Sequence, residues 1–190
     1  MTTIIGTHNS MTFSRPAKWY GYLMIPFARC QRLTIRGQFY AGVRCFDLRI
    51  RFRRDGTPCF AHGMMTLRGN VQGTLMKINA LAYFAKCPVY VRLVLEDPQC
   101  RTWQAKLFRT FCKVYEEDFP LLTFFQGNRK GDWAQVYEFK AKPILAQCVS
   151  SMATDARWYE KLIPWFYARR RNKKNLADPP SADIALYDFL

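Results

Sequence analysis

The chain has 190 residues, the usual size of one domain, so we expect residues 1–190 to form a single domain with a sizeable core. A hydrophobic content of 49% and an aromatic content of 16% exclude a disordered chain, and no apolar run approaches the ~18–20 residues that cross a bilayer. The net charge of +15 favours polyanionic partners, namely phosphate esters, anionic lipid headgroups or nucleic acid, although solubility alone would also explain it.

The seven cysteines are scattered along the chain and form no CxxC pair. Their spacing fits neither a zinc site nor a small disulfide scaffold, so we expect reduced thiols that behave as small hydrophobic residues. Reduced thiols indicate a reducing compartment. The first residues lack the basic and apolar regions of a signal peptide, which favours a cytoplasmic location.

The predicted elements begin with a short β-branched strand, Thr3–Gly6, which polar residues follow. A long connection rich in aromatic residues leads to a short helix over Thr34–Ala41, which Gly42 ends. The next strand covers residues 43–52. Polar residues at the carboxyl end of a first strand are typical of the catalytic side of an α/β fold.

Strand 43–52 shows a period of two along the chain. Its even positions from 46 to 52 are apolar, and the odd positions Asp47, Arg49 and Arg51 are charged. The pattern predicts one face against a hydrophobic layer and a second face on which Asp47 and Arg49 lie side by side. That charged face is either a solvated surface or the floor of a site.

Strands and helices alternate through the rest of the chain, and each prediction follows from apolar periodicity and turn residues. The remaining predicted elements are a strand over Pro58–Ala61, a helix over Asn70–Ala85, a strand over Val89–Leu95, a helix marked by Trp103 to Tyr115, a strand over Leu121–Phe125, a helix capped by Asp132, a strand over Pro143–Val149, a helix from Thr154 or Asp155 to Pro164, a basic surface segment from Arg169, and a strand from Ile184 to Leu190.

This order predicts an α/β fold with a mainly parallel sheet. Because polar residues recur at strand ends, a small or irregular TIM-type (β/α) barrel is the best fit. A doubly wound open sheet is the alternative, but the chain has no Gly-rich phosphate loop that would support it.

Both histidines of the chain lie at predicted strand ends, His8 after the first strand and His62 after the third. A lone histidine is more often structural, but two of them flanking the Asp47 and Arg49 strand favour a site. Histidine titrates near neutral pH and serves as base for a nucleophile or as acid for a leaving oxygen. Arg49 offers a planar fork for phosphate, and Asp47 can orient it. The set predicts cleavage of a phosphodiester.

Several segments resemble the X region of the phosphatidylinositol-specific phospholipase C family, in the family's order. They are Gly6-Thr7-His8-Asn9-Ser10, Gly42-Val43-Arg44-Cys45-Phe46-Asp47-Leu48-Arg49 and His62-Gly63, and Ala185-Leu186-Tyr187-Asp188-Phe189 is similar to the closing strand of bacterial members. The resemblance implies an irregular TIM-type barrel. It also implies cleavage between glycerol and phosphate, driven by the inositol 2-hydroxyl.

The same resemblance implies a role for each matched residue. His8 is similar to the base towards the hydroxyl, and His62 to the acid for the leaving oxygen. Asp47 matches an acidic position that metal-dependent and metal-independent members share. Arg49 matches the position where metal-independent bacterial members carry arginine and calcium-dependent members a carboxylate, which implies catalysis without a cofactor.

A cation site is the alternative, because Asn9, Asp47 and Glu96 could hold Ca²⁺ or Mg²⁺ through oxygen atoms. Asn9 falls where calcium-dependent members place a metal ligand and bacterial members an aspartate. Glu96 lies at the end of strand 89–95 and could instead form an ion pair with Arg92 or Arg49, which is the interpretation that we favour.

Further residues are candidates for contact with substrate: Asn9, Arg92, Glu96, Arg129 and Asp188. Arg129 lies in the loop after a predicted strand, which could equally be a plain turn. Asp188 could orient Arg49 or a histidine, or form a structural hydrogen bond. Pro164 to Lys174 joins aromatic residues to a cationic run. This segment could rest on an anionic membrane surface or follow a phosphate backbone, or it could simply be a helix with solvated basic residues.

Two other functions stay open. A related barrel phosphodiesterase would cleave glycerophosphodiesters with Mg²⁺ or Ca²⁺, but such enzymes favour a Glu-x-Asp pair where this chain has Asp47 and Arg49. A non-catalytic protein that binds polyanions would use only the positive charge. The partner that we expect is a phosphodiester or phospholipid substrate, with peripheral contact to an anionic membrane; nucleic acid is not the favoured partner.

Overall fold

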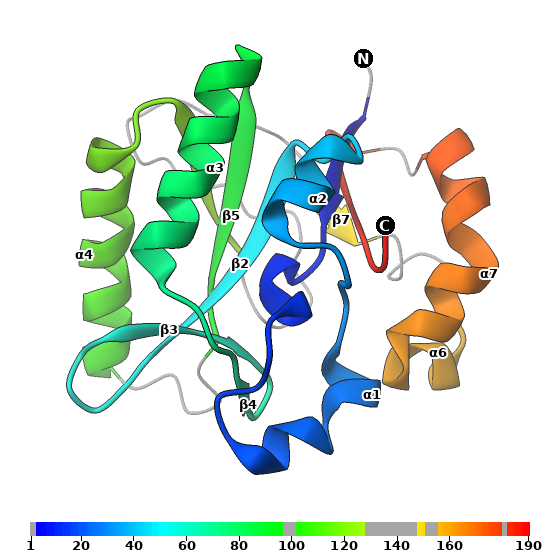
Figure 1. Cartoon of the computed structure of the whole chain (residues 1–190), viewed down its shortest axis with the longest axis horizontal. Helices are drawn as coiled ribbons and strands as arrows, with labels where there is room; N and C mark the ends of the chain where they lie inside the picture. Colours follow the sequence, from blue (N-terminus) through cyan, green and yellow to red (C-terminus); the bar gives the residue numbers. More distant parts are fainter. Residues whose placement is uncertain (1–2, 97–101, 128–147, 151–155, 180–181) are drawn as a thin grey trace.

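The computed structural model describes residues 3–96, 102–127, 148–150, 156–179 and 182–190 (Figure 1). Strands and helices alternate along most of these residues. The elements are β1 (Ile4–Thr7), η1 (Ser10–Phe13), η2 (Trp19–Tyr22), α1 (Ile25–Ala28), α2 (Ile35–Tyr40), β2 (Cys45–Phe52), β3 (Pro58–His62), β4 (Met65–Thr66), α3 (Val71–Ala85), β5 (Val89–Leu95), α4 (Thr102–Asp118), β6 (Leu122–Gly127), β7 (Cys148–Ser150), α6 (Trp158–Leu162), α7 (Pro164–Ala177) and β8 (Ile184–Tyr187).

The sheet is an arc of parallel strands in the order β7-β8-β1-β2-β5-β6. β3 pairs antiparallel with the carboxyl-terminal end of β2, and β4 pairs with β3. Within the described residues no pairing joins β6 to β7. Helices α3 and α4 pack against β5, α4 also against β2 and β6, and α7 flanks the opposite end of the arc (Figure 1). The architecture is that of an irregular (β/α) barrel.

The even positions of β2 form the outer apolar layer of this barrel. Phe46, Leu48 and Ile50 are fully buried and share one hydrophobic cluster with side chains of α3, β5 and α4. The alternation of strand 43–52 therefore predicts this face correctly. A local cap starts α3, which helps to cover this face, since the side chain of Asn70 accepts a hydrogen bond from the main-chain N–H of Gly73 at 2.7 Å.

The odd positions of β2 face the inside of the barrel. Their side chains are apolar at the amino end of the strand and charged further along it. At the amino end, Cys45 clusters with Phe125, Ile184 and Leu186. The barrel is narrow here, because a Cβ atom on Gly6 would lie only 2.5 Å from Cδ2 of Leu186.

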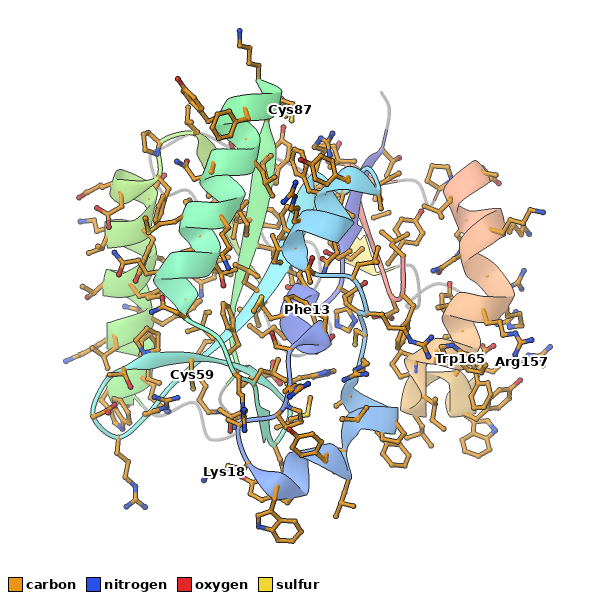
Figure 2. The ribbon with its side chains drawn as sticks, viewed as in Figure 1. Phe13, Lys18, Cys59, Cys87, Arg157 and Trp165 are labelled. Carbon is orange, nitrogen blue, oxygen red and sulfur yellow. The ribbon has the colours of Figure 1, made fainter. Side chains whose placement is uncertain are left out.

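One step further along the strands the inner positions become polar. Asp47 of β2 pairs in register with Arg92 of β5, and the pairing of Thr7 with Tyr187 places His8 beside Asp188. The carboxyl ends of the strands lie at the same edge of the molecule as η2. Figure 2 shows this arrangement, with Lys18 before η2 at one edge and Cys87 before β5 at the other.

Two predicted elements near the carboxyl terminus need correction. Pro164 does not end a helix but begins α7, which includes the basic residues from Arg169 to Lys174 that we expected in a surface segment. Proline is tolerated there because the N–H groups of a first turn have no helical partner. The preceding helix, α6, begins at Trp158, later than Thr154 or Asp155.

The last strand is also shorter than predicted. β8 ends at Tyr187, and Phe189 adopts a positive φ of 51° and donates its main-chain N–H to the carbonyl of Cys30 at 2.6 Å. The chain therefore leaves the sheet before its last residue. The helix expected from Asp132, and all of the strand expected over Pro143–Val149 except residues 148–149, lie outside the described residues.

Candidate active site

His8 lies at the carboxyl end of β1, between an acid and a cation. Its Nδ1 atom is 2.8 Å from Oδ1 of Asp188, and its Nε2 atom is 2.6 Å from Nη2 of Arg49. A guanidinium only donates, so Nε2 accepts and Nδ1 carries the proton that is donated to Asp188. Asp188 thereby selects the tautomer in which Nε2 is the basic nitrogen.

The turn after His8 aims this ring at the inside of the barrel. Asn9 adopts the left-handed conformation with φ 48°, which asparagine tolerates better than most residues. Its main-chain N–H donates to Oδ2 of Asp47 at 3.0 Å, so the turn is attached to β2. The side chain of Gln31 donates to the carbonyls of His8 and Tyr187 at 3.1 and 2.7 Å, which ties the ends of β1 and β8 together.

Arg49 lies between two buried carboxylates. Its Nε atom is 3.3 Å from Oδ2 of Asp47, and its Nη1 atom is 3.2 Å from Oε2 of Glu96. Glu96 also accepts the main-chain N–H of Gly63 at 2.9 Å. Burial lowers the pKa of Arg49, but the charges of Asp47 and Glu96 outweigh burial and raise it above its ordinary value. Arg49 is therefore a permanent cation at the floor of the barrel.

Asp47 is fully buried and forms an ion pair with a second arginine, Arg92 of β5. Nη1 of Arg92 lies 2.6 Å from Oδ1 of Asp47. Burial raises the pKa of Asp47, but the charges of Arg92 and Arg49 outweigh that effect and hold it well below its ordinary value. Asp47 is thus a permanent anion that fixes Arg49.

His62 is the last residue of β3 and faces His8 across the site. The two ring centroids are 6.1 Å apart, with an angle of 80° between the planes. The Nδ1 atom of His62 donates to the carbonyl of Ala28 at 2.7 Å, which leaves Nε2 as the basic nitrogen. Burial, and after it the charges of Arg49 and His8, lower the pKa of His62 to about 4. The ring is therefore neutral near pH 7 in the free protein.

The charged face of β2 thus lies buried inside the barrel and is not a solvated surface, since Asp47 is 0% and Arg49 is 7% exposed. The ion pair that we favoured for Glu96 is confirmed, with Arg49 as its partner. Arg92 is fully buried and holds Asp47. Of the partners expected for it, Asp188 binds a histidine, His8. Arg129 lies outside the described residues.

Of the three side chains expected to hold a cation, the two carboxylates form ion pairs and the amide does not form a hydrogen bond with the described residues. The carboxylates of Asp47 and Glu96 both accept from Arg49, whose guanidinium stands between them. The side-chain amide of Asn9 is buried and has no hydrogen-bond partner among the described residues.

The connection between β1 and α2 contributes groups that sequence reasoning missed. The carbonyl of Ala28 fixes the tautomer of His62, and Gln31 fixes the backbone of His8. The connection has no apolar periodicity, and a main-chain carbonyl that accepts a hydrogen bond leaves no trace in residue type. That the two histidines share one site is indicated by their positions at predicted strand ends and by the resemblance of the flanking motifs.

Comparison with known proteins decides the family. The family model described as "Phosphatidylinositol-specific phospholipase C, X domain" matches residues 2–147. The chain belongs to this family. A search of curated protein sequences gave no significant match.

Solved structures show the same fold for this X-domain chain. The phosphatidylinositol-specific phospholipase C from Listeria monocytogenes aligns with a TM-score of 0.64 at 16% identity, over 98% of this chain and 88% of that one. A single-residue variant of the Staphylococcus aureus enzyme aligns with a TM-score of 0.63 at 14% identity, over 98% and 84%. These likenesses confirm the irregular TIM-type barrel.

Another Staphylococcus aureus structure, described under modulation of membrane binding, aligns with a TM-score of 0.51 at 18% identity. That alignment covers 67% of this X-domain chain but only 47% of the other, so the chain spans about half the length of that enzyme.

Proposed function

We propose that the chain cleaves the phosphodiester of a phosphatidylinositol lipid between glycerol and phosphate, by internal attack of the inositol 2-hydroxyl. The observation that carries the proposal is the line from Asp188 through His8 to Arg49, with His62 facing His8 at 6.1 Å between ring centroids. Family membership over residues 2–147 supports the same reaction.

His8 is the general base in this proposal. Its Nε2 atom holds a lone pair because Asp188 holds the proton on Nδ1. The nucleophilic hydroxyl donates its proton to Nε2, and the carboxylate of Asp188 then stabilises the imidazolium that forms. Asp188 itself keeps its charge throughout the step.

Arg49 binds the phosphoryl oxygens. Its Nη2 atom now donates to Nε2 of His8 at 2.6 Å, so the base and the anion-binding group meet at one point. A phosphodiester that enters this point takes over the Arg49 donor and frees Nε2 for the hydroxyl. The nucleophile and the phosphorus are thereby held close together, which removes much of the entropic cost of the step. Asp47 and Glu96 hold Arg49 in place.

His62 is the general acid towards the glycerol oxygen. Its pKa of about 4 in the free site makes it neutral near pH 7, so it must gain a proton when substrate binds. The negative phosphodiester offsets the charge of Arg49, one of the causes of the lowered pKa, and therefore raises it. After transfer, diacylglycerol leaves and a cyclic inositol phosphate remains.

We infer that this reaction needs no metal ion. The support is the position of Arg49, whose guanidinium stands between the carboxylates of Asp47 and Glu96 that would otherwise face a cation. An arginine at this point supplies a fixed positive charge for the phosphoryl oxygens. A hard cation would have to displace Arg49 from both carboxylates.

An apolar rim beside the site supports contact with a membrane surface. η2, α1 and the residues between them expose large apolar side chains, among them Trp19 at 78% and Leu23 at 69%, and Met64 after β3 is 68% exposed. Ala28, the last residue of α1, binds His62, so the rim adjoins the site. None of the described helices is long and apolar enough to span a membrane.

The basic run of α7 supports membrane contact less well. Phe166 is 45% exposed, but Tyr167 is fully buried and Arg170 binds Glu160 of α6. Aromatic side chains that sit at headgroup level need exposure, which η2 and α1 provide. We therefore propose the η2–α1 rim as the contact surface, with α7 as a solvated basic helix.

The test is product analysis on vesicles that contain phosphatidylinositol, with and without EDTA. We expect the release of diacylglycerol and of a cyclic inositol phosphate, at rates that EDTA does not change. Phosphorus NMR detects the cyclic inositol phosphate. Vesicles of phosphatidylcholine alone are the control and should give no product, because that headgroup has no hydroxyl beside the phosphate. Failure to release either product, or release only with an added divalent cation, would overturn the respective part of the proposal.

A further inference from the structure

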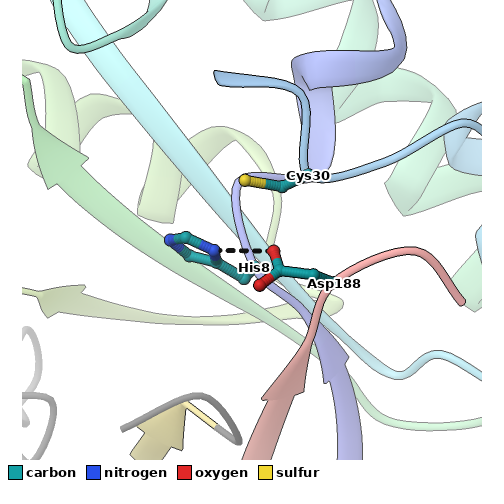
Figure 3. A group of neighbouring side chains, drawn as sticks. All are labelled: His8, Cys30 and Asp188. Carbon is teal, nitrogen blue, oxygen red and sulfur yellow. Dashed lines mark hydrogen bonds and ion pairs between the residues drawn. The ribbon is translucent and has the colours of Figure 1, made fainter. Parts of the chain in front are cut away.

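A thiol lies beside the proposed base and has no part in the reaction. Cys30, between α1 and α2, is fully buried, and its sulfur lies next to His8 and Asp188 (Figure 3). One ligand atom from each of the three residues lies within 4.8 Å of the other two. The sulfur is also 4.0 Å from Nδ1 of His62, so it sits between both histidines.

The second observation is an unused carboxylate oxygen. Asp188 is 1% exposed, and its Oδ1 atom binds His8, but its Oδ2 atom is buried and has no hydrogen-bond partner among the described residues. Leaving a buried carboxylate oxygen without a partner is costly. A ligand at this point would satisfy it.

We propose that Cys30, His8 and Asp188 form a site for a zinc ion that switches the active site off. Zn²⁺ prefers sulfur, imidazole nitrogen and carboxylate oxygen, and three protein ligands with a water complete its tetrahedron. Bond lengths of 2.0–2.3 Å place tetrahedral ligands roughly 3.3–3.7 Å apart. Atoms that already lie within 4.8 Å of one another reach that spacing by small side-chain rotations.

The donor set distinguishes this site from the oxygen-only cation site considered above. Ca²⁺ and Mg²⁺ bind through oxygen atoms and disfavour thiolate sulfur. Sequence spacing could not show the zinc site, because its ligands come from the ends of β1 and β8 and from the connection before α2. The imidazole gives the ion access, since the side chain of His8 is 12% exposed.

Zinc binding is incompatible with catalysis because each needs the proton of the His8 imidazole on a different ring nitrogen. When Nδ1 of His8 binds the ion, the neutral imidazole carries its proton on Nε2. Nε2 then has no lone pair for the substrate hydroxyl or for Arg49, which now donates to it at 2.6 Å. Binding releases the thiol proton of Cys30 to solvent and moves the imidazole proton from Nδ1 to Nε2.

The experiment measures Zn²⁺ binding to the whole, metal-free chain by calorimetry, and Co²⁺ binding by absorption. We expect one tight zinc site per chain and a sulfur-to-cobalt charge-transfer band. Cys30→Ala should lose the band and weaken Zn²⁺ binding by more than about 100-fold, since even an outer partner of a zinc site is worth 10–100-fold. Cys112→Ala, which removes another fully buried thiol in α4, is the matched control and should bind like wild type.

Inhibition rests on the proposed function, but binding does not. In the vesicle assay, Zn²⁺ should stop the wild type and Cys112→Ala at concentrations that leave Cys30→Ala active, and the same concentration of Ca²⁺ should stop none of them. Binding that Cys30→Ala leaves unchanged, or no binding at all, would overturn the site. Binding with the expected cobalt band in a chain that never cleaves the lipid would overturn the proposed function alone. If Cys30→Ala does not fold, Cys30→Ser replaces it and should lose the band.

Discussion

The Nε2 atom of His8 accepts a hydrogen bond from Nη2 of Arg49 at 2.6 Å. In the free protein Nε2 of His8 and Nη2 of Arg49 therefore engage each other, and in the proposed mechanism an anion that enters the site releases both of them. Asp188 on the far side of His8 and Asp47 and Glu96 around Arg49 hold this contact in place. In the proposed reaction this contact brings the hydroxyl, the phosphorus and the base together with few groups.

Asp188→Asn removes the charge that stabilises the His8 imidazolium and allows the amide to select the wrong tautomer. We expect turnover of phosphatidylinositol vesicles to fall by roughly 10²–10⁴-fold, the usual contribution of acid–base catalysis, with KM nearly unchanged. The control is Asp178→Asn, an exposed carboxylate at the end of α7, which should keep wild-type turnover. A loss seen mainly in KM would place Asp188 in substrate binding and not behind the base.

The lowered pKa of His62 predicts how stability depends on pH. The folded protein keeps this ring neutral down to about pH 4, whereas the unfolded chain binds a proton near pH 6.5. The stability that comes from keeping His62 neutral is complete above the pKa of the unfolded chain and is lost as the pH falls towards the pKa of the folded protein. The free energy of unfolding should therefore fall by about 2 kcal/mol between pH 7 and pH 4.5.

His62→Gln removes this titration, so its free energy of unfolding should depend less on pH by that amount. Urea unfolding of both proteins at the two pH values measures the difference. If the free energy of unfolding changed with pH by the same amount in wild type and variant, the site would not hold His62 neutral.

The buried pair of Arg92 and Asp47 predicts a large effect on stability. Arg92→Ala leaves the Asp47 charge buried without one of its two arginines, and breaking such a pair costs about 3–5 kcal/mol of unfolding free energy. Arg53→Ala removes an exposed arginine and should change stability by no more than about 0.5 kcal/mol. Equal effects of the two substitutions in urea unfolding would contradict the role given to Arg92.

Part of this site could be predicted from sequence. The period of two over 46–52 shows that Asp47 and Arg49 share a face, because side chains alternate along any strand. It does not show that the face is buried, since burial depends on β1 and β8, which lie far away in the sequence. The position of Asp188 beside His8 likewise follows from the pairing of β1 with β8 and not from local pattern.

Helix α7 is an element for which the local sequence pattern gave the wrong prediction. Pro164 and the basic run after it suggested an end and a surface segment, because proline and clustered charge are both poor helix-interior features. The structure uses Pro164 at the first turn and pairs Arg170 with Glu160 of α6, so tertiary contacts decide the outcome. Similarly, no local pattern connects Ala28 with His62, 34 positions apart, although their hydrogen bond sets a tautomer.

The apolar rim predicts how the protein meets vesicles. Trp19→Ala removes a side chain that is 78% exposed on η2, and the lost burial in the interface should weaken vesicle binding by roughly 10–100-fold in a sedimentation assay. Turnover of a soluble, short-chain phosphatidylinositol should stay the same.

Phe84→Ala is the matched control for the rim, because Phe84 is 80% exposed but lies at the end of α3, away from η2. Its vesicle binding should equal that of wild type. If both variants lost the same affinity, membrane contact would not be confined to the η2–α1 rim.

His8 and His62 are proposed to act as base and acid in one site, and the decisive measurement is the turnover of phosphatidylinositol vesicles by His8→Ala and His62→Ala. We expect each substitution alone to lower turnover by at least about 10²-fold, the double variant to lose little more than either single one, and thermal unfolding of both single variants to stay cooperative. Turnover within a few-fold of wild type in either folded variant would contradict this proposal.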